Sequence, residues 1–158
     1  MRNVLRLLPC LAIVLLAGCS SYGKRFTAAA IAPGNATQFA GAYSGRWMSA
    51  SHPGGTGNLR CILTKVSDSD YNADFHATWH GFASEHSVVL HTKPAARKKS
   101  GAGLREFEGT SALRTLIGAG TYTCKGTVDP HGMQACYDAT YDRGGFQMSR
   151  VRSGAALR

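Results

Sequence analysis

The sequence predicts an all-β fold: an antiparallel up-and-down meander of about eight strands that forms a small closed barrel or a tight sandwich. Three observations lead to this prediction. Apolar and polar residues alternate in short segments from Phe39 onward, which is typical of half-buried strands. Gly, Asp, Pro and Ser separate these segments at regular spacing. Of the 158 residues, 17% are charged and 19 are glycine, a composition that favours strands and turns over charge-rich helices.

The first residues have the pattern of an export signal. Arg2 and Arg6 come before an almost entirely apolar run, from Cys10 to Ala17, that is too short to span a membrane. We therefore expect residues 1–18 to be a signal peptide. Without them the chain keeps 16 basic and 9 acidic residues, so the mature protein is basic.

The run ends in Leu16, Ala17, Gly18 and Cys19, which resembles the lipobox of bacterial lipoproteins. The resemblance implies that Cys19 is lipidated and becomes the first residue of the mature chain. It also implies export and a lipid anchor in the envelope. Because Ser20 follows Cys19 where aspartate would favour the inner membrane, it implies the periplasmic face of the outer membrane.

We expect four regions in the chain. Residues 19–38 follow the signal with small residues, Gly, Pro and Asn and without a steady period, so they are predicted to be the lipidated cysteine and a flexible tether. Residues 39–152 form the barrel domain, and 153–158 form a tail. The predicted strands cover residues 41–49, 57–66, 71–80, 85–93, 103–111, 119–128, 133–141 and 145–151.

Turn residues predict how the strands connect. Asp129, Pro130, His131 and Gly132 suit a type I turn whose glycine takes the left-handed position of a three-residue hairpin loop. The links are short except at about 94–102 and 112–118, so a meander is the most economical topology.

The pattern Gly-x-Tyr-x-Gly-x-Trp from Gly41 to Trp47, followed late in the chain by Gly145-Phe146-Gln147-Met148, resembles the outline of lipocalin-type and avidin-type β-barrels. Such a barrel holds one small apolar ligand or is filled by its own side chains. We expect six aromatic residues to line the interior: Tyr43, Trp47, Phe75, Trp79, Tyr137 and Tyr141.

Cysteine spacing leaves two alternatives. Cys124 and Cys136 lie symmetrically about Pro130, so pairing in a hairpin would place them on one face, where a disulfide is predicted. Cys61 competes for Cys124 across the barrel. The other alternative is that all three are small buried thiols.

The sequence predicts no catalytic residue, no cofactor and no metal site. The positions of His76, His80 and His86 differ by even numbers of residues, and His80 is expected opposite His86. Residues four apart in a strand, such as His76 and His80, are about 13 Å apart, however, which is too far for them to share one ion. G-x-S-x-G, H-E-x-x-H and phosphate-binding glycine loops are missing from the sequence.

The predicted partners follow from export. They are the membrane through Cys19, and either a small apolar ligand or an envelope protein that binds surface loops, but no nucleic acid. The basic stretch Lys93 to Gly103 is expected to be either a solvated loop or a contact for anionic lipids. The predicted function is therefore a barrel that binds a small ligand, with a filled structural or inhibitory barrel as the alternative.

Overall fold

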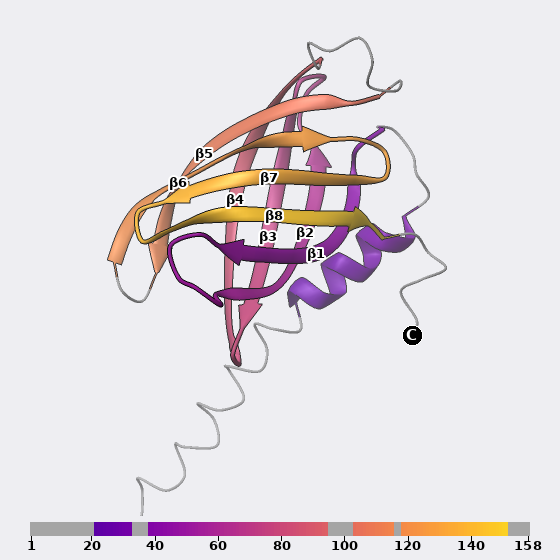
Figure 1. Cartoon of the computed structure of the whole chain (residues 1–158). Helices are drawn as coiled ribbons and strands as arrows, with labels where there is room; N and C mark the ends of the chain where they lie inside the picture. Colours follow the sequence, from indigo (N-terminus) through magenta and orange to yellow (C-terminus); the bar gives the residue numbers. More distant parts are fainter. Residues whose placement is uncertain (1–20, 33–37, 95–102, 116–117, 152–158) are drawn as a thin grey trace, which may run out of the picture.

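Eight antiparallel strands form a closed barrel in which each strand pairs with the next and β8 closes onto β1 (Figure 1). The computed structural model describes residues 21–32, 38–94, 103–115 and 118–151. The predicted fold class is confirmed, and of the two predicted forms the chain adopts the barrel. The strands are β1 (Gly41–Ser49), β2 (Thr56–Lys65), β3 (Asp70–Trp79), β4 (Phe82–Pro94), β5 (Arg105–Thr115), β6 (Gly118–Val128), β7 (Gly132–Ala139) and β8 (Asp142–Arg150).

A two-residue turn connects β3 to β4. His80 and Gly81 have φ angles of 45° and 82°, and positive values at both central residues are what a type I′ hairpin turn requires. Trp79 therefore pairs directly with Phe82, and β4 begins three residues earlier than predicted.

The turn between β6 and β7 is shorter than predicted. The Asp129 carboxylate accepts hydrogen bonds from the backbone N–H groups of His131 and Gly132 at 2.7 and 2.8 Å, and Val128 pairs with Met133. The aspartate closes the turn without a bulge, so the predicted three-residue loop with a left-handed Gly132 is wrong. The loop is one residue shorter, which shifts the pairing of β6 with β7.

The strands β5 and β6 extend into the predicted link at 112–118. They extend because residues 112–115 carry no proline or turn signal that would end the ladder. Leu113 accordingly pairs with Gly120 and faces the core. Of the links predicted to be long, residues 95–102 and 116–117 lie outside the described residues.

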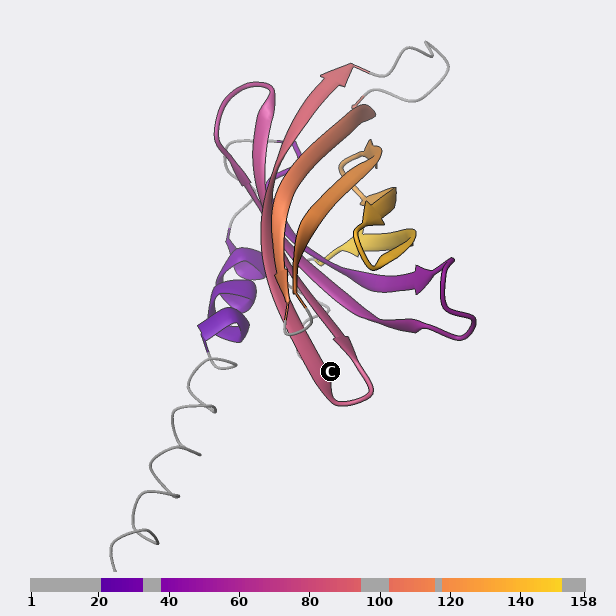
Figure 2. The ribbon, with the colours of Figure 1, turned by 90° about the vertical axis from the view of Figure 1, so that its left-hand side faces the viewer.

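A helix covers residues 21–31, where the sequence predicts an irregular tether, so that prediction is wrong for these residues. Tyr22, Phe26 and Ala30 recur at helical spacing and are buried against Ala42 and Ile62 on the outer face of the barrel. Figure 2 shows the helix lying along the outside of the sheet. This apolar stripe is one residue wide and three residues long. Because small residues surround it, its helical spacing is hard to recognise in the sequence.

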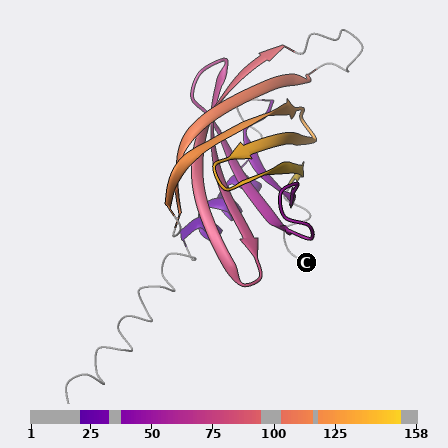
Figure 3. The same ribbon diagram turned by 60° about the vertical axis from the view of Figure 1, so that its left-hand side comes forward.

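The interior of the barrel has two ends, which are lined by different inward-facing residues. We call the end with the β1–β2, β3–β4 and β7–β8 turns the Trp47 end, where the β3–β4 hairpin projects beyond its neighbours (Figure 3). We call the opposite end, where β1 begins and β8 ends, the Phe39 end. Both ends share one continuous core cluster.

Candidate functional site

The Phe39 end of the barrel is filled. Phe39 is buried across it and packs edge-on against Tyr71, with ring centroids 6.0 Å apart. The Tyr43 hydroxyl donates a hydrogen bond of 2.6 Å to the Phe39 carbonyl, which joins the chain before β1 to the first inward side chain. The remaining side chains of this half are large and buried: Leu63, Leu90, Phe107, Val128, Met133 and Met148.

The Trp47 end is built differently, because large aromatic residues there lie opposite glycines. Trp47 pairs with Gly57, and Tyr137 pairs with Gly144. A Cβ atom on Gly57 would lie 2.7 Å from the Trp47 Nε1, and one on Gly144 would lie 2.7 Å from the Tyr137 hydroxyl oxygen. Each ring therefore covers a glycine, and a larger residue at either glycine would collide first with backbone, at the Thr78 or the Met48 carbonyl oxygen, and also with the ring.

Three polar atoms are buried at or beside this end without a hydrogen-bond partner among the described residues: Trp47 Nε1, His86 Nε2 and Ser111 Oγ. They come from β1, β4 and β5, and all three residues belong to the inward-facing set. An unpaired buried polar group costs about 1–3 kcal/mol. Native proteins keep only a few such groups per hundred residues, and each of the three calls for a partner, which an ordered water or a ligand can supply.

His86 lies between aromatic rings. It stacks on Phe75 with ring centroids 5.2 Å apart and contacts Tyr122 edge-on at 4.6 Å. Burial lowers the pKa of His86 to about 4, so the imidazole is neutral at pH 7. Ser111 pairs with Tyr122 across the β5–β6 ladder, so Tyr122 lies next to both unpaired groups.

A hydrogen-bonded network lies near the rim of the same end. Asp142 accepts from the Ser49 hydroxyl at 2.6 Å and from the Tyr137 hydroxyl at 2.7 Å. Burial and the Asp142 hydrogen bond raise the pKa of Tyr137 above its usual range. This network fixes the Tyr137 ring, which stacks on Tyr122 at 6.0 Å.

The structure separates the six predicted lining residues. Trp47 and Trp79 lie together at the Trp47 end, with ring centroids 6.2 Å apart, and Tyr137 belongs to the same end. Tyr43 and Phe75 are fully buried in the packed core. Tyr141 is exposed in the β7–β8 turn, where its hydroxyl lies 3.4 Å from the Ala119 carbonyl.

Sequence reasoning missed His86 and Ser111. The prediction that His80 lies opposite His86 is wrong, because the two-residue turn pairs His86 with Phe75 and His76 with Glu85. His86 therefore faces inward, whereas His76 faces outward and stacks under Tyr22 of the helix. The signal available in the sequence was the His80-Gly81 dipeptide, which fits a type I′ turn.

The predicted disulfide between Cys124 and Cys136 does not form. The shortened β6–β7 loop pairs Cys124 with Tyr137 and Cys136 with Lys125, so the two thiols lie on opposite faces. Cys124 and Cys61 are buried, Cys136 is exposed, and all three are free thiols. The alternative of small buried thiols is therefore correct for Cys61 and Cys124 and wrong for Cys136, which is exposed.

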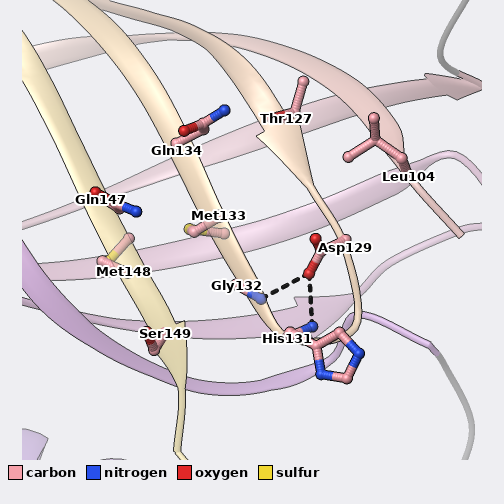
Figure 4. Close-up of a pocket in the computed structure, with 10 residues that line it drawn as sticks. All are labelled: Leu104, Thr127, Asp129, His131, Gly132, Met133, Gln134, Gln147, Met148 and Ser149. Carbon is pink, nitrogen blue, oxygen red and sulfur yellow. Dashed lines mark hydrogen bonds between the residues drawn. The ribbon is translucent and has the colours of Figure 1, made fainter. Parts of the chain in front are cut away.

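A shallow depression of about 310 Å³ lies at the other end of the barrel, beside the β6–β7 turn (Figure 4). Asp129 and the paired Gln134 and Gln147 contribute to its lining, and none of the predicted lining residues does. Within the described parts of the chain, no three His, Cys, Asp or Glu side chains are placed to hold a metal ion. No helix in those parts is long and apolar enough to cross a bilayer.

No protein-family model matches the sequence, and no curated protein is significantly similar to it. Among solved structures, the chain is similar to a de novo designed fluorescence-activating β-barrel, with 14% sequence identity and a TM-score of 0.46. The match covers 73% of this chain and 94% of the designed one. Similarity at this level transfers no function.

Proposed function

We propose that this protein is an exported, lipid-anchored barrel that binds a small, largely apolar ligand at its Trp47 end. The observation that carries the proposal is the set of three buried polar atoms without partners, at Trp47, His86 and Ser111. A closed barrel of eight strands is just wide enough to hold one small molecule. The export signal and Cys19 anchor are the parts of the proposal that come from sequence.

The chemistry of the three atoms narrows the ligand class. The indole N–H of Trp47 only donates, so it needs an acceptor. A neutral imidazole and a hydroxyl each donate or accept, so His86 and Ser111 place no charge in the site. We therefore expect an uncharged apolar body that carries at least one hydrogen-bond acceptor, with the aromatic rings packed against its flat faces.

The first test is native mass spectrometry of residues 20–158, purified from a periplasm-like compartment. A non-covalent adduct of small mass that is lost on unfolding supports the proposal. The bare mass of the chain would instead favour a barrel that works through its surface.

The second test uses two matched variants on β4. Ser84→Trp adds a large side chain on the inward-facing side of β4 between the rim and His86, at a position that is exposed in the wild type, whereas Val89→Trp adds the same side chain at an exposed position on the outward side. With the uncharged fluorescent ketone 6-propionyl-2-(dimethylamino)naphthalene as the probe, we expect Ser84→Trp to weaken binding about tenfold or more, equivalent to about 1.4 kcal/mol, and Val89→Trp to leave it unchanged. Equal affinity in the two variants would exclude the Trp47 end as the binding site.

A further inference from the structure

We propose that the Trp47 end of the barrel rests on the lipid bilayer, so that the ligand exchanges directly between the membrane and the barrel. This inference rests on the proposed function, because it requires the lipid on Cys19. It adds the orientation of the barrel and the source of the ligand.

The direction of the helix supplies the first argument. The Tyr22 ring stacks on His76 at 4.8 Å, and the Tyr22 hydroxyl donates to the Asp74 carbonyl at 3.0 Å. Ala30, at the other end of the helix, packs with Ala42, which lies near the start of β1 at the Phe39 end. The helix therefore begins nearer the Trp47 end and runs toward the Phe39 end, as Figure 2 shows.

Chain length supplies the second argument. Cys19 precedes Tyr22 by three residues, which span at most about 10 Å. Along β3, the three residues from His76 to Trp79 also span about 10 Å, so the lipidated residue can reach the level of Trp79. Val66, at the opposite end, lies beyond Tyr71 and is about 20 Å from the level of His76, out of reach of Cys19.

The third argument is the surface of the Trp47 end itself. Phe82 is 63% exposed and Met48 is 65% exposed, and both lie where strands meet the turns of this end. Trp79 and Tyr141 are exposed beside them, with Trp79 and Phe82 in ring contact at 6.0 Å. Large exposed apolar residues gathered at one end of a domain mark an interaction surface, and Trp and Tyr favour the membrane–water interface.

The charged residues at the Trp47 end also suit a lipid bilayer. Arg46 and Arg143 are exposed near this rim, where Arg143 lies across the β7–β8 ladder from the exposed Asp138 and the Asp142 carboxylate is hydrogen-bonded to Ser49 and Tyr137. Basic side chains beside exposed aromatic rings suit a bilayer that contains anionic lipid.

The Phe39 end has a more polar surface. Lys65 pairs with Asp68 at 2.7 Å, and Lys93 lies 3.9 Å from Glu106. The link that holds most of the basic stretch Lys93 to Gly103 leaves β4 at this end, after Pro94.

The test uses the full mature lipoprotein, with its lipid, in vesicles of phosphatidylethanolamine and phosphatidylglycerol that carry bromine on their acyl chains. The chain has two tryptophans, Trp47 and Trp79, and both lie at the Trp47 end, so the unchanged protein reports on this end. We expect brominated lipid to quench more than half of the tryptophan fluorescence relative to unbrominated vesicles.

A matched pair of single-tryptophan variants gives the control. In the background of Trp47→Phe and Trp79→Phe, Phe82→Trp and Val66→Trp each place one exposed indole, at opposite ends of the barrel. We expect quenching for the first and none for the second. Should the background fail to fold, amide exchange of the wild type with and without vesicles replaces it; vesicles are expected to increase protection at residues 80–82 and to leave it unchanged at 66–69, where the Val66 and Ser67 amides are already hydrogen-bonded to Asp70.

The outcomes separate this inference from the proposed function. A protein that floats with vesicles but shows no quenching, or equal quenching at both ends, overturns the orientation and leaves the anchor intact. A protein that does not float overturns both the anchor and the orientation. Ligand binding is measured without membranes, so its failure alongside selective quenching would remove the ligand and keep the bilayer contact.

Discussion

His86 is an inward-facing imidazole held between Phe75 and Tyr122 in an apolar interior. Its Nε2 has no partner among the described residues, so nothing nearby compensates a positive charge. The fold therefore stabilises the neutral form, which keeps a polar atom available in the site without placing a charge there.

This predicts a pH dependence of folding. Unfolded histidine binds a proton near pH 6.5, whereas folded His86 does so only near pH 4, so its contribution to stability is complete above pH 6.5 and is lost as the pH falls toward 4. We expect the free energy of unfolding to fall by about 3 kcal/mol from this group over that window. Urea unfolding of wild type and His86→Phe at several pH values measures it, and parallel pH profiles for the two proteins would contradict the assignment.

At this scale, the sequence identified the aromatic residues but not the polar ones. Alternation along β3 and β7 correctly placed Phe75, Trp79 and Tyr137 on the inward face. The faces of His86 and Cys136 depended on which residue lies across the hairpin, and a shift of the pairing by any odd number of residues, as in both hairpins, moves a side chain to the other face. The alternation of apolar and polar residues within a strand can be read from neighbouring residues, whereas the register between two strands depends on the turn that connects them.

The helix over residues 21–31 lies between the proposed anchor and the barrel. Its buried face is small, but two specific contacts add to it: Arg25 bonds to Asp74 at 3.1 Å, and Tyr22 stacks on His76. The barrel ladder closes without the helix, since β1 pairs with both β2 and β8. The helix is therefore a separately detachable layer on a complete barrel.

We expect Tyr22→Ala to release the helix and leave the barrel folded. The change removes a buried ring and its hydrogen bond to Asp74, a loss of about 3 kcal/mol or more if the site does not collapse. Hydrogen exchange should show lost protection over residues 21–31 and retained protection in the strands. The exposed Lys24→Ala serves as control, and unchanged protection in Tyr22→Ala would show that other contacts hold the helix.

Strands were predicted better than this helix for a physical reason. Eight strands with period-2 alternation leave a signal in many residues, and all eight predicted ranges begin within three residues of the observed strand. The helix buries only one narrow stripe, and its surrounding Ala and Gly residues weaken any periodic signal. Sequence therefore describes the barrel well and its attachments poorly.

Across the described part of the molecule, the three cysteines fall into two classes, buried and exposed. Cys61 and Cys124 are buried on β2 and β6, and burial raises the pKa of Cys61 well above its usual range and that of Cys124 to about 11. Cys136 is exposed on the outer face of β7. A thiol reagent therefore distinguishes the surface of the barrel from its interior.

We expect iodoacetamide to modify Cys136 rapidly in the folded domain and to reach Cys61 and Cys124 only when the barrel opens, because the thiolate is the reacting form and needs access. Peptide mass spectrometry over time measures the three rates, and those of the two buried thiols should rise together with urea. Rapid modification of Cys124 in native buffer would show an interior open to solvent.

Closure of the barrel also constrains how the chain reaches this state. The pairing of β1 with β8 joins Tyr43 to Arg150, residues more than a hundred positions apart. Contacts between such distant residues slow folding, since the intervening loop must be ordered before they form. Until the last strand arrives, β1 presents an unpaired edge that can pair with other chains. A chain with this topology therefore depends on being kept apart from its copies until its C-terminal strand has joined the sheet.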